Sequence, residues 1–542
     1  MLDHEIDPRS GYCAAKSIYY SKRKPIKFPQ EEYLSVPTFV SKLPHRGDTA
    51  LIDFSTGNRI TFSQLWQSVK SLAAGLLQIG VKKGDVILLL SPNSVHFPVI
   101  CMGIMWIGAI VTTTNPLNTS AEMGKQIADS KAKLAFVTPE LATKLATANL
   151  PLILISTEQH KNSRGIRSLE DLLSSDTSNL PDINVRQDDT ATLLYSSGTT
   201  GLSKGVISTH RNLISMVCIL LNGLNLSGTS DDAFLCTVPM FHIYGLAVFA
   251  CGLLGSGSAV VVLSKFELGE MLRAIEKYKI TYLPLVPPIL LALRNTEITK
   301  GFDLGSLSTV ICGGAPLSKE STEEFISRFP GVTIRQGYGL TETTGIGAST
   351  DTQDESRHYG TAGMLSPNTE AKVVDPDSGN PLPPNQRGEL WLRGPFVMKG
   401  YFSNPEATIS ALDEDGWLRT GDLCYIDDEG YIFVVDRLKE LIKYKGYQVA
   451  PAELEALLRS HPEISDVAVI PFPDKAAGQV PMAYVVRKPG SRLSEASIIE
   501  FVAQQVAPYK KVRRVGFVKE IPKNTAGKLL RKDLIKLATS KL

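Results

Sequence analysis

The sequence predicts an α/β fold with parallel sheets, joined to a small β-rich subdomain and to a final unit that mixes helices and strands. From about residue 50 to residue 345, apolar runs of strand length alternate with helical patterns. Between about residues 356 and 431 the pattern changes to short strands separated by Gly, Pro, Asn and Asp turns. The last unit covers about 105 residues. This order places a large α/β region first and a separate module last.

Three strand-like runs precede helical patterns: "DVILLLS" before a helix over 94–108, "AVVVL" before "GEMLRAIEKYKI", and "STVICGG" before "KESTEEFISRF". "LAFVT" and "LILIS" are two further strand-like runs. Because parallel strands are joined by crossover connections, usually helices, this alternation favours parallel pairing. "PAELEALLRSH" predicts a helix of the last unit, with Pro451 in its first turn and Glu453 and Glu455 near the positive end of its dipole.

The stretch from Val86 to Ala121 contains no Asp, Glu, Lys or Arg, so a membrane-spanning helix has to be weighed against a buried core. Pro92, Pro98 and Pro116 break the stretch, and its continuous apolar part, "FPVICMGIMWIGAIV", is short for a span. A buried helix leading into a strand is the favoured interpretation.

At 542 residues the chain exceeds one compact core, and three or four folding units are expected. The net charge of +2 predicts no bulk attraction to nucleic acid or to a membrane. The charge is unevenly distributed, because residues 509–542 hold eleven Lys and Arg against two acids, whereas the first 508 residues hold 46 Lys and Arg against 53 Asp and Glu. The basic last module is either a solvated helical face or a surface for a polyanionic ligand.

The seven cysteines show no C-x-x-C spacing and mostly lie in apolar runs such as "SMVCILL" and "FACGLL". Buried free thiols in a reducing compartment are therefore expected, and a zinc site is not. The first residues, "MLDHEIDPRS", carry acids and no apolar stretch, so no signal peptide is expected.

"LLYSSGTTGLSKGVISTH", residues 193–210, is the most informative motif. A hydrophobic strand is predicted to end at Tyr195, and almost all of the next ten residues are Ser, Thr or Gly, with Lys204 near the end. Glycines let backbone N–H groups approach a ligand, hydroxyls add neutral donors and the lysine supplies a point charge, which together suit a triphosphate. The motif is not a Walker A loop, since Ser203 stands where that loop needs Gly. A flexible Ser/Gly linker is the alternative, and the flanking apolar strands argue against it.

The residue order in this loop resembles the first signature of the adenylate-forming superfamily, which includes acyl-CoA synthetases, insect luciferases and peptide-synthetase adenylation domains. Four further motifs follow in the order of that family: "QGYGLTET" (336–343), "TGD" (420–422), "DRLKELIKYKGYQVAPAELE" (436–455) and "PKNTAGKLLR" (522–531). The resemblance covers nearly the whole chain. It is greatest to plant 4-coumarate–CoA ligases, through "PMFHIY", "SKFEL" and "KELIKYKGYQVAPAELE".

The resemblance implies a large N-terminal domain over residues 1–436 that binds ATP and the acyl group. It would contain two parallel-sheet α/β subdomains and a small β-barrel-like subdomain at about residues 356–431. A mobile α+β C-terminal domain over residues 437–542 would carry the catalytic lysine. In relatives this small domain rotates about a hinge, at the position of Lys439 here, so that the two half-reactions use two of its faces.

The resemblance also implies a two-step reaction with ATP, Mg²⁺ and coenzyme A. A carboxylate attacks the α-phosphate of ATP to give an acyl-adenylate and pyrophosphate, and a thiol then displaces AMP. Because a carboxylate is a weak nucleophile, catalysis is expected to rest on positioning and charge neutralisation. Free coenzyme A is the expected acceptor, since nothing in the sequence suggests a carrier domain.

By their places in these motifs, the residues expected at the phosphates are Ser196, Ser197, Gly198, Thr199, Thr200 and Lys204, with Thr341 at the α-phosphate. Thr200 and Glu342 are expected to hold Mg²⁺, which prefers oxygen ligands. The adenine slot is expected from Gly314, Ala315, Gln336, Gly337 and Tyr338. Asp422 and Arg437 are expected near the ribose, a task that suits a carboxylate.

The residues expected to act in catalysis are Lys528, Lys443, Thr341 and His242, with Lys528 drawing the carboxylate and the α-phosphate together. Lys439, Lys443 and Gln448 are expected to contact the nucleotide, and Lys265, Lys445 and Gly446 to contact coenzyme A. A solvated helix face is the alternative for Lys443 and Lys445, and simple packing is the alternative for His242.

The acyl pocket is expected from His242, Tyr244, Ala247, Val248, Ile311, Gly314, Gly337, Gly345, Ile346 and Ser349. The chain departs here from the 4-coumarate–CoA ligase pattern: Ala247-Val248 replaces a polar Asn-Ser pair, Gly345-Ile346-Gly347 replaces Pro-Val-Leu, and Ile311-Cys312 stands where some relatives carry Lys. An apolar pocket binds no phenol hydroxyl and rejects analogues weakly. A medium or long acyl chain, including the cyclopentanone-octanoate precursors of jasmonate, is therefore the first hypothesis. A 4-coumarate or cinnamate ligase is the alternative, and a luciferase-type monooxygenase or an adenylate-binding protein without catalysis is less favoured.

The sequence ends in Ser540-Lys541-Leu542, which is either a peroxisomal address read by an import receptor or the polar end of a last helix predicted over 532–538. β-Oxidation in peroxisomes starts from CoA thioesters, so a ligase that makes acyl-CoA thioesters is expected to act in peroxisomes. Peroxisomal localisation through this tripeptide is expected, with no nucleic-acid partner and no membrane span.

Overall fold

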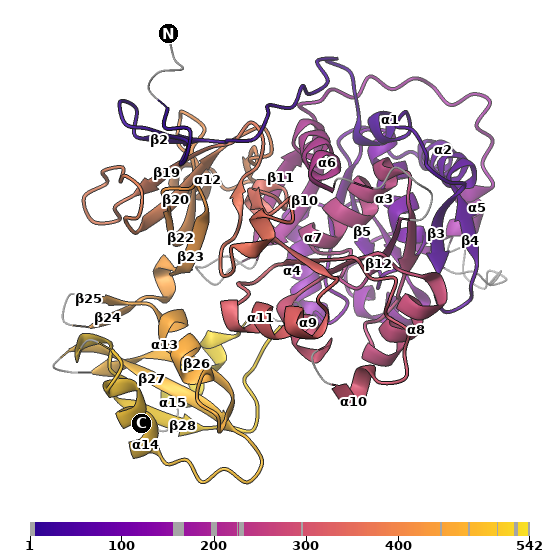
Figure 1. The fold of residues 1–542 in the computed structure, drawn as a ribbon. Helices are drawn as coiled ribbons and strands as arrows, with labels where there is room; N and C mark the ends of the chain where they lie inside the picture. Colours follow the sequence, from indigo (N-terminus) through magenta and orange to yellow (C-terminus); the bar gives the residue numbers. More distant parts are fainter. Residues whose placement is uncertain are drawn as a thin grey trace.

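The computed structural model describes residues 6–155, 167–196, 203–224, 226, 232–293, 296–444, 447–474, 477–506, 508–524 and 529–539, with the backbone alone at 296, 447 and 448. Within this part of the chain the strands form four sheets, of eight, nine, six and five strands. Figure 1 shows the two larger sheets and their helices in one body, with the six-stranded sheet beside it and the C-terminal unit below.

The eight-stranded sheet carries the Ser/Thr/Gly-rich motif near one edge. Its order is β21-β11-β10-β6-β5-β7-β8-β9, and the neighbours from β10 to β9 pair in parallel. β11 and β21 add an antiparallel edge. The bounds are β5 Val86–Leu90, β6 Ile110–Thr113, β7 Leu134–Val137, β8 Leu152–Leu154, β9 Arg167–Ser168, β10 Thr190–Ser196, β11 Lys204–Thr209 and β21 Gly400–Tyr401.

The nine-stranded sheet has the order β18-β17-β16-β15-β14-β12-β13-β3-β4, and its six central strands pair in parallel. β4, β17 and β18 pair antiparallel at the two edges. The bounds are β3 Thr49–Asp53, β4 Arg59–Thr61, β12 Ala233–Cys236, β13 Ala259–Val262, β14 Tyr282–Leu285, β15 Thr309–Gly313, β16 Thr333–Tyr338, β17 Ala348–Ser349 and β18 Met364–Leu365. The predicted α/β class with parallel sheets is confirmed.

The helices of this body are α1 Val36–Val40, α2 Phe62–Gln78, α3 His96–Trp106, α4 Ser120–Ser130, α5 Leu169–Leu173, α6 His210–Leu224, α7 Ile243–Gly245, α8 Leu268–Tyr278, α9 Pro287–Leu293, α10 Thr296–Thr299 and α11 Lys319–Arg328. α2 shows how they form: Thr61 and Gln64 make a capping box at its start, and Leu65, Leu72 and Leu76 on its inner side are fully buried.

The charge-free stretch from Val86 to Ala121 forms β5, α3 and β6, as the sequence predicts. α3 is apolar all round and buried from Phe97 to Met105, because α2 and other core elements cover it. Its ends lie two residues inside the predicted 94–108 range. In the described part of the chain no helix is long and apolar enough to cross a membrane.

The six-stranded sheet is antiparallel, in the order β1-β2-β19-β20-β22-β23. The bounds are β1 Tyr12–Cys13, β2 Ile18–Tyr20, β19 Glu370–Val374, β20 Gly388–Arg393, β22 Leu418–Ile426 and β23 Ile432–Arg437, with α12 Pro405–Ala411 between β20 and β22. Tyr19, Val373, Leu390 and Cys424 pack on its inner face. The sheet differs from the predicted 356–431 subdomain because it also contains β1 and β2, two strands from the N-terminal part of the chain. Strands of two or three residues leave no periodicity in the sequence.

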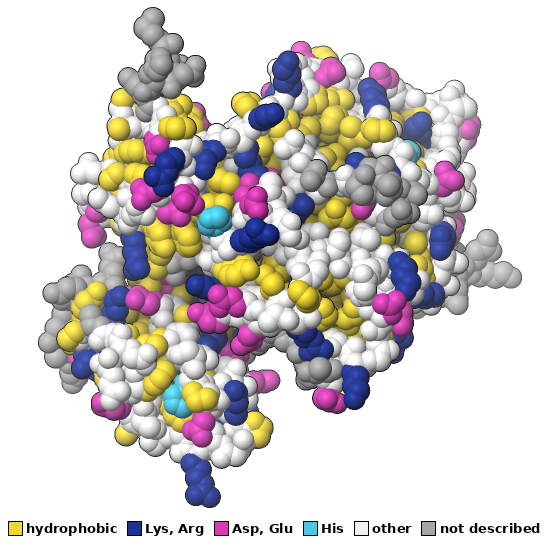
Figure 2. Space-filling model, viewed as in Figure 1, with side chains coloured by type: hydrophobic (Ala, Val, Ile, Leu, Met, Phe, Trp, Pro, Cys, Tyr) yellow, Lys and Arg dark blue, Asp and Glu magenta, His cyan; other side chains and the backbone are white. Residues whose placement is uncertain are grey.

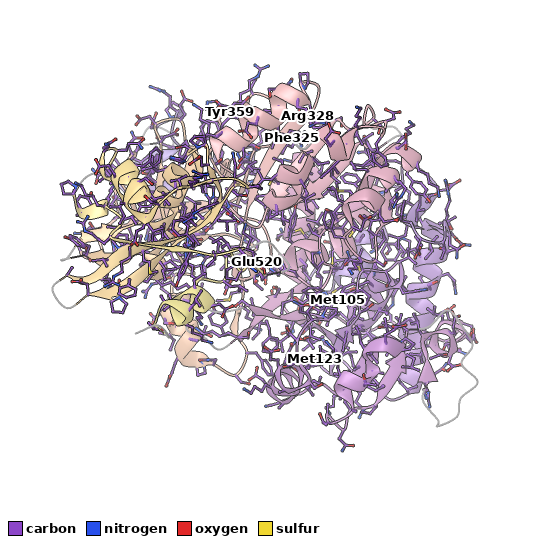
Figure 3. All side chains as sticks on the ribbon, turned by 90° about the horizontal axis from the view of Figure 1, so that it is seen from below. Met105, Met123, Phe325, Arg328, Tyr359 and Glu520 are labelled. Atoms are coloured by element: carbon purple, nitrogen blue, oxygen red, sulfur yellow. The ribbon has the colours of Figure 1, made fainter. Side chains whose placement is uncertain are left out.

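The C-terminal unit is a five-stranded sheet with helices on both faces. α13 and α14 pack on one face through Leu454, Leu458 and Ile498, and α15 packs on the other through Leu534. The bounds are β24 Ile442–Tyr444, β25 Tyr447–Val449, β26 Ile464–Asp474, β27 Gly478–Arg487, β28 Arg514–Phe517, α13 Pro451–Arg459, α14 Glu495–Ala503 and α15 Arg531–Thr539. Figure 2 shows a groove between this unit and the rest of the molecule, and Figure 3 places Glu520 at the same boundary.

One carboxylate joins the six-stranded sheet to the C-terminal unit. The N-cap residue of α13, Ala450, has no side chain that can cap the helix, and Asp436 on β23 accepts a hydrogen bond from the Ala452 N–H at 2.8 Å. Burial raises the pKa of Asp436 to about 6, against the pull of the Ala452 hydrogen bond. Arg531 lies close by and is held by Glu440 at 2.9 Å.

The segment after β2 crosses from the six-stranded sheet to the large body. Arg23 donates to the Ser349 carbonyl at 2.6 Å and to Glu355 at 2.8 Å, and it also pairs with Asp351. Further along, the Gln187 side-chain amide donates to the Pro29 carbonyl at 3.1 Å. Residues 21–32 therefore form an N-terminal strap held at both ends.

All seven cysteines are free thiols, and six of them are buried. Cys218 is half-buried, and burial raises the pKa of its thiol to about 11. The expectation of free, buried thiols is confirmed, with Cys218 as the partly exposed case. Burial raises the thiol pKa of Cys101, Cys236, Cys251, Cys312 and Cys424 as well, which keeps these sulfurs protonated and unreactive near neutral pH.

His210, the first residue of α6, is fully buried. Its Nδ1 accepts a hydrogen bond from the Val36 N–H at 3.1 Å, which links α1 to α6. Burial lowers the pKa of His210 to about 3. The ring is therefore neutral in the folded protein throughout the physiological range.

This histidine makes folding stability depend on pH. The unfolded chain binds a proton at His210 below pH 6.5, whereas the folded chain does not until about pH 3. The free energy of unfolding therefore decreases as the pH is lowered from 6.5 to 3. The limiting slope is about 1.4 kcal/mol per pH unit for this one group. We expect His210→Asn to destabilise the protein at pH 7.5 but to show a smaller fall of the denaturation midpoint between pH 7.5 and 5. Parallel midpoint curves for the two proteins would contradict this assignment.

Candidate active site

The Ser/Thr/Gly-rich motif joins two neighbouring antiparallel strands. β10 ends at Ser196 and β11 begins at Lys204, and these two residues are paired directly across the ladder. The Lys204 ammonium lies 5.0 Å from the centre of the Tyr401 ring, within cation–π distance. Residues 197–202, with the predicted Ser197, Gly198, Thr199 and Thr200, lie outside the described residues. The structure therefore fixes the two anchors of the loop and their separation.

Glu342 lies directly against this loop. It belongs to a single turn of 3₁₀ helix, Thr341–Thr343, and its Oε1 accepts from the Ser196 hydroxyl at 3.1 Å and from the Tyr401 hydroxyl at 2.9 Å. The turn ends in two residues with positive φ, Thr344 at 53° and Gly345 at 90°, which reverse the chain. Two sequence motifs about 140 residues apart, the loop and "QGYGLTET", thus meet at one carboxylate.

Tyr401 was not singled out in the sequence. Burial and then the adjacent Glu342 raise the pKa of its hydroxyl, so the group stays a hydrogen-bond donor. Tyr401 lies on β21, a strand of two residues that pairs with β11. β21 is far from β11 and from the loop in the sequence. No motif or periodicity could have marked it.

Asp422 forms the second polar centre of the site. Its carboxylate is 2% exposed, accepts from the Tyr338 hydroxyl at 2.6 Å and pairs with Arg437 Nε at 2.6 Å. Burial works against the charge on Arg437, but Asp422 and other acids hold the Arg437 pKa above its ordinary value. Burial, followed by Asp422, raises the pKa of Tyr338. The predicted partners Tyr338, Asp422 and Arg437 are therefore in direct contact.

The cross-strand register explains this contact. Asp422 on β22 and Arg437 on β23 are directly opposite each other, and Tyr338 ends β16 of the nine-stranded sheet. The "CGGAP" and "QGYG" segments lie at the carboxyl ends of β15 and β16, which pair in parallel with Gly313 beside Gly337. Carboxyl ends of parallel strands are the usual place for ligand sites in α/β sheets. Gly314, at φ 82°, begins the turn that carries Ala315, and Gln336 lies one residue before Gly337.

We call the open space beside Gly337 the slot, because a Cβ atom on Gly337 would have no described atom within 4 Å. The Tyr244 hydroxyl donates to the Ile311 carbonyl at 3.1 Å, which ties the α7 segment to β15. A Cβ atom on Gly345 would lie 3.5 Å from Ile243 and 3.6 Å from Ala247, and Ala247 is buried. Val248, Ile311 and Ile346 pack half-buried against the main core. The structure thus brings most of the predicted acyl-pocket residues together.

His242 and Ser349 are placed at the edges of this region. The exposed His242 ring caps α7, because its Nδ1 accepts from the Tyr244 N–H at 3.3 Å. Ser349 on β17 is paired with Gly337, but its hydroxyl donates to Asp351 at 2.6 Å. Ser349 is therefore committed to a hydrogen bond within the protein.

The predicted residues of the C-terminal unit are only partly described. Lys439 lies in the 3₁₀ turn Leu438–Glu440, and Lys443 is exposed on β24 opposite the Gln448 backbone. Lys445, Gly446 and Lys528 lie outside the described residues, as does the Gln448 side chain. Lys265 is exposed after β13. Among the described residues, no hydrogen bond or ion pair joins the Lys265 or Lys443 side chain to the site.

Among the described residues, Glu342 is the acid that lies beside the Ser/Thr/Gly-rich loop. In the described ranges no three His, Cys, Asp or Glu side chains gather as a metal cluster. Glu342 is one carboxylate beside two hydroxyls, an oxygen donor set that fits a hard cation shared with a phosphate ligand.

Comparison with protein families matches two segments. Residues 41–402 match the family described as AMP-binding enzyme, and residues 453–528 match its C-terminal domain. The first match alone covers most of the chain. It includes the Ser/Thr/Gly-rich loop, the Glu342 turn and the slot beside Gly337.

Curated and solved relatives agree with this family. A probable CoA ligase CCL5 of Humulus lupulus and a peroxisomal OPC-8:0-CoA ligase 1 of Arabidopsis thaliana are each 62% identical, over 99% of this chain and 98% and 99% of their own. The ATP-bound MatB structure from Rhodopseudomonas palustris superposes with a TM-score of 0.83 at 28% identity, covering 93% of this chain and 98% of that one. The chain therefore belongs to the AMP-binding enzyme family and is an acyl-CoA ligase of the 4-coumarate–CoA ligase-like group.

Proposed function

We propose that the protein activates a medium- or long-chain carboxylic acid of the cyclopentanone-octanoate type with ATP and transfers the acyl group to coenzyme A. The observation that carries this proposal is that Ala247, Val248 and Ile311, which are predicted to form the acyl pocket, have no side-chain group that could bind a phenol hydroxyl. The name of the 62% identical Arabidopsis relative, an OPC-8:0-CoA ligase, supports the same substrate class.

In the first half-reaction a carboxylate oxygen forms a bond to the α-phosphorus of ATP, and the bond to pyrophosphate breaks. Ser196 and Lys204 hold the two ends of the loop that receives the phosphates, and the turn of Thr341 and Glu342 lies against it. The Glu342 carboxylate is the proposed protein ligand of Mg²⁺, which neutralises phosphate charge when bound. Thr200 is the second proposed ligand.

The nucleotide is proposed to lie across the carboxyl ends of β15 and β16, with its ribose at Asp422. A carboxylate accepts about four hydrogen bonds, and a buried one held by Tyr338 and Arg437 is fixed before the ribose arrives. Gly314, Ala315, Gln336 and Gly337 are the proposed walls of the adenine slot.

In the second half-reaction the sulfur of coenzyme A bonds to the acyl carbon, the thiol loses its proton and AMP leaves. Lys265, Lys443, Lys445, Gly446 and Gln448 are proposed to act at this stage, after the C-terminal unit rotates about Lys439. The hydrogen bond between Asp436 and the Ala452 N–H spans that hinge position, so the rotation has to strain or break it.

Lys528 is proposed to draw the carboxylate and the α-phosphate together. We expect Lys528→Ala to lower the adenylation rate by roughly 10²–10³-fold, because a positioned charge at the transition state is lost, while ATP affinity changes little. Pyrophosphate release and ATP binding measure the two effects. Lys532→Ala, an exposed lysine of the same module, is the matched control. Undiminished pyrophosphate release by Lys528→Ala would remove Lys528 from the mechanism.

The substrate proposal predicts an order of specificity constants. The hydroxyls of Tyr244 and Ser349 already donate to groups of the protein, so the pocket favours apolar chains over 4-coumarate, whose phenol loses its hydrogen bonds to water on binding. We expect cyclopentanone-octanoate and medium-chain fatty acids to exceed 4-coumarate by about tenfold or more in kcat/KM, measured by thioester formation. A higher kcat/KM for 4-coumarate would establish the alternative, a hydroxycinnamate ligase.

Ser540-Lys541-Leu542 is proposed to bind the peroxisomal import receptor, in keeping with the peroxisomal relative from Arabidopsis. The tripeptide lies outside the described residues. We expect a fluorescent fusion at the N-terminus to enter peroxisomes, and deletion of the three residues to leave it in the cytosol with unchanged ligase activity. Peroxisomal import of the deleted form would refute this assignment.

A further inference from the structure

Asp422 lies in a bulge of the six-stranded sheet. The register between β20 and β22 shifts between Glu389 and Trp391. Over this interval β20 contributes one residue, Leu390, whereas β22 contributes residues 420–422. Extra residues in a strand bend it and change the direction of its side chains. The bulge therefore sets the direction of the Asp422 carboxylate.

The backbone N–H groups of this bulge have lost their partners in the ladder, so other acceptors have to replace them. The Thr420 hydroxyl donates to the Leu390 carbonyl at 2.6 Å and accepts from the Asp422 N–H at 3.1 Å. Glu389 Oε1 accepts from the Gly421 N–H at 3.0 Å. One hydroxyl and one carboxylate of the protein thus hold the bulge.

Packing restrains the bulge only weakly at Gly421. The residue has a φ of 71°, in the left-handed region that favours glycine, and a Cβ atom there would have no described atom within 4 Å. Because no described atom packs against this side of the bulge, its hydrogen bonds have to hold it in place. The Glu389 carboxylate therefore restrains the backbone directly before Asp422.

Glu389 is itself held by Trp391, which follows it by two residues on the same face of β20. Trp391 Nε1 donates to Glu389 Oε2 at 2.8 Å, so the two carboxylate oxygens accept from two different groups. Arg419 is directly opposite Trp391 on β22, and its guanidinium carbon lies 4.9 Å from the centre of the indole ring. The indole, held from the neighbouring strand, fixes the orientation of the carboxylate.

We propose that Glu389 is a positioning residue for the nucleotide: held by Trp391, it keeps the Gly421 N–H in place so that the Asp422 carboxylate faces the ribose hydroxyls. This inference rests on the proposed function, because the ribose contact of Asp422 is part of that proposal. Glu389 acts through the bulge and not by contact with the substrate.

The effect of Glu389 is expected in ATP binding, not in the chemical step. The ribose hydroxyls are remote from the reacting phosphorus, so their hydrogen bonds to Asp422 are equally strong in the ground state and in the transition state. Such uniform binding lowers KM without raising kcat. A wrongly directed Asp422 loses these hydrogen bonds, while the phosphate contacts proposed for Ser196 and Lys204 remain.

The test compares ATP with 2′,3′-dideoxy-ATP, which lacks both ribose hydroxyls, in pyrophosphate release by the full-length enzyme. We expect wild-type kcat/KM to favour ATP by about tenfold to a hundredfold, the range for one hydrogen bond to a charged group. Glu389→Met removes both acceptor oxygens at similar size. We expect it to lower the preference about tenfold by raising the KM for ATP alone.

Two milder variants keep the test decisive if Glu389→Met does not fold. Glu389→Gln keeps one oxygen for the Gly421 N–H, and we expect it to retain more of the ATP preference than Glu389→Met. Trp391→Phe keeps an aromatic ring but removes the donor to Glu389 Oε2, and we expect a partial loss of the preference, again in the KM for ATP.

Glu370→Met is the matched control. Glu370 lies on the same face of the same sheet, but its carboxylate accepts from Arg393 Nε at 2.6 Å instead of from a bulge N–H. We expect this variant to keep the ATP preference.

Equal losses for the two nucleotides in Glu389→Met, or an unchanged preference in Glu389→Met and Trp391→Phe, would overturn the inference while leaving the proposed function intact. A wild type that uses both nucleotides equally well would overturn the proposed ribose contact of Asp422, and the inference with it.

Discussion

The buried carboxylate of Asp422 is the interaction on which the arrangement of the site depends. A carboxylate that is 2% exposed is tolerated only when its charge and hydrogen-bonding capacity are matched, and Tyr338 and Arg437 supply that match. Tyr338 belongs to the nine-stranded sheet and Arg437 to the six-stranded sheet. This polar contact therefore joins the two sheets, beside an apolar cluster in which Ala348 and Leu365 of the nine-stranded sheet pack with residues of the six-stranded sheet, and the proposed nucleotide slot lies where the two sheets meet.

Glu342 connects the nine-stranded sheet to the eight-stranded sheet in a similar way. Its side chain accepts from Ser196 and Tyr401, and its backbone carbonyl accepts from the Met398 N–H at 2.9 Å. Ser196 at the start of the Ser/Thr/Gly-rich loop, the turn of Thr341 and the edge strand β21 are thereby fixed relative to one another. Asp422 and Glu342 are both held by hydrogen bonds within the protein, so ligand binding costs little conformational entropy at these two side chains.

The sequence predicted the parallel sheets and the helix in "KESTEEFISRF", because both rest on local periodicity. The family resemblance assigned Ser196 and Glu342 to one nucleotide site, and the structure places them in contact. The sequence did not predict β1 and β2, which contain two and three residues and pair with strands of the six-stranded sheet. Tyr401 and Asp436 were missed for a related reason: the partner of each lies far away in the chain or on another element. Register and burial determine such contacts, and neither can be counted along a sequence. Several predicted site residues, Lys528 among them, lie outside the described residues and stay predictions.

The N-terminal strands have a consequence for the way the chain is made. Tyr19 donates to the carbonyl of Leu382, which is 363 residues further along. At about 5–20 residues per second, a ribosome needs roughly 20–70 s to supply that partner. During this time β1 and β2 can pair with each other, but β19 is missing, so the backbone N–H and C=O groups on the other edge of β2 have no strand partner. The edge of β2 is thus open to chaperones, proteases and wrong strand pairing until β19 has been made.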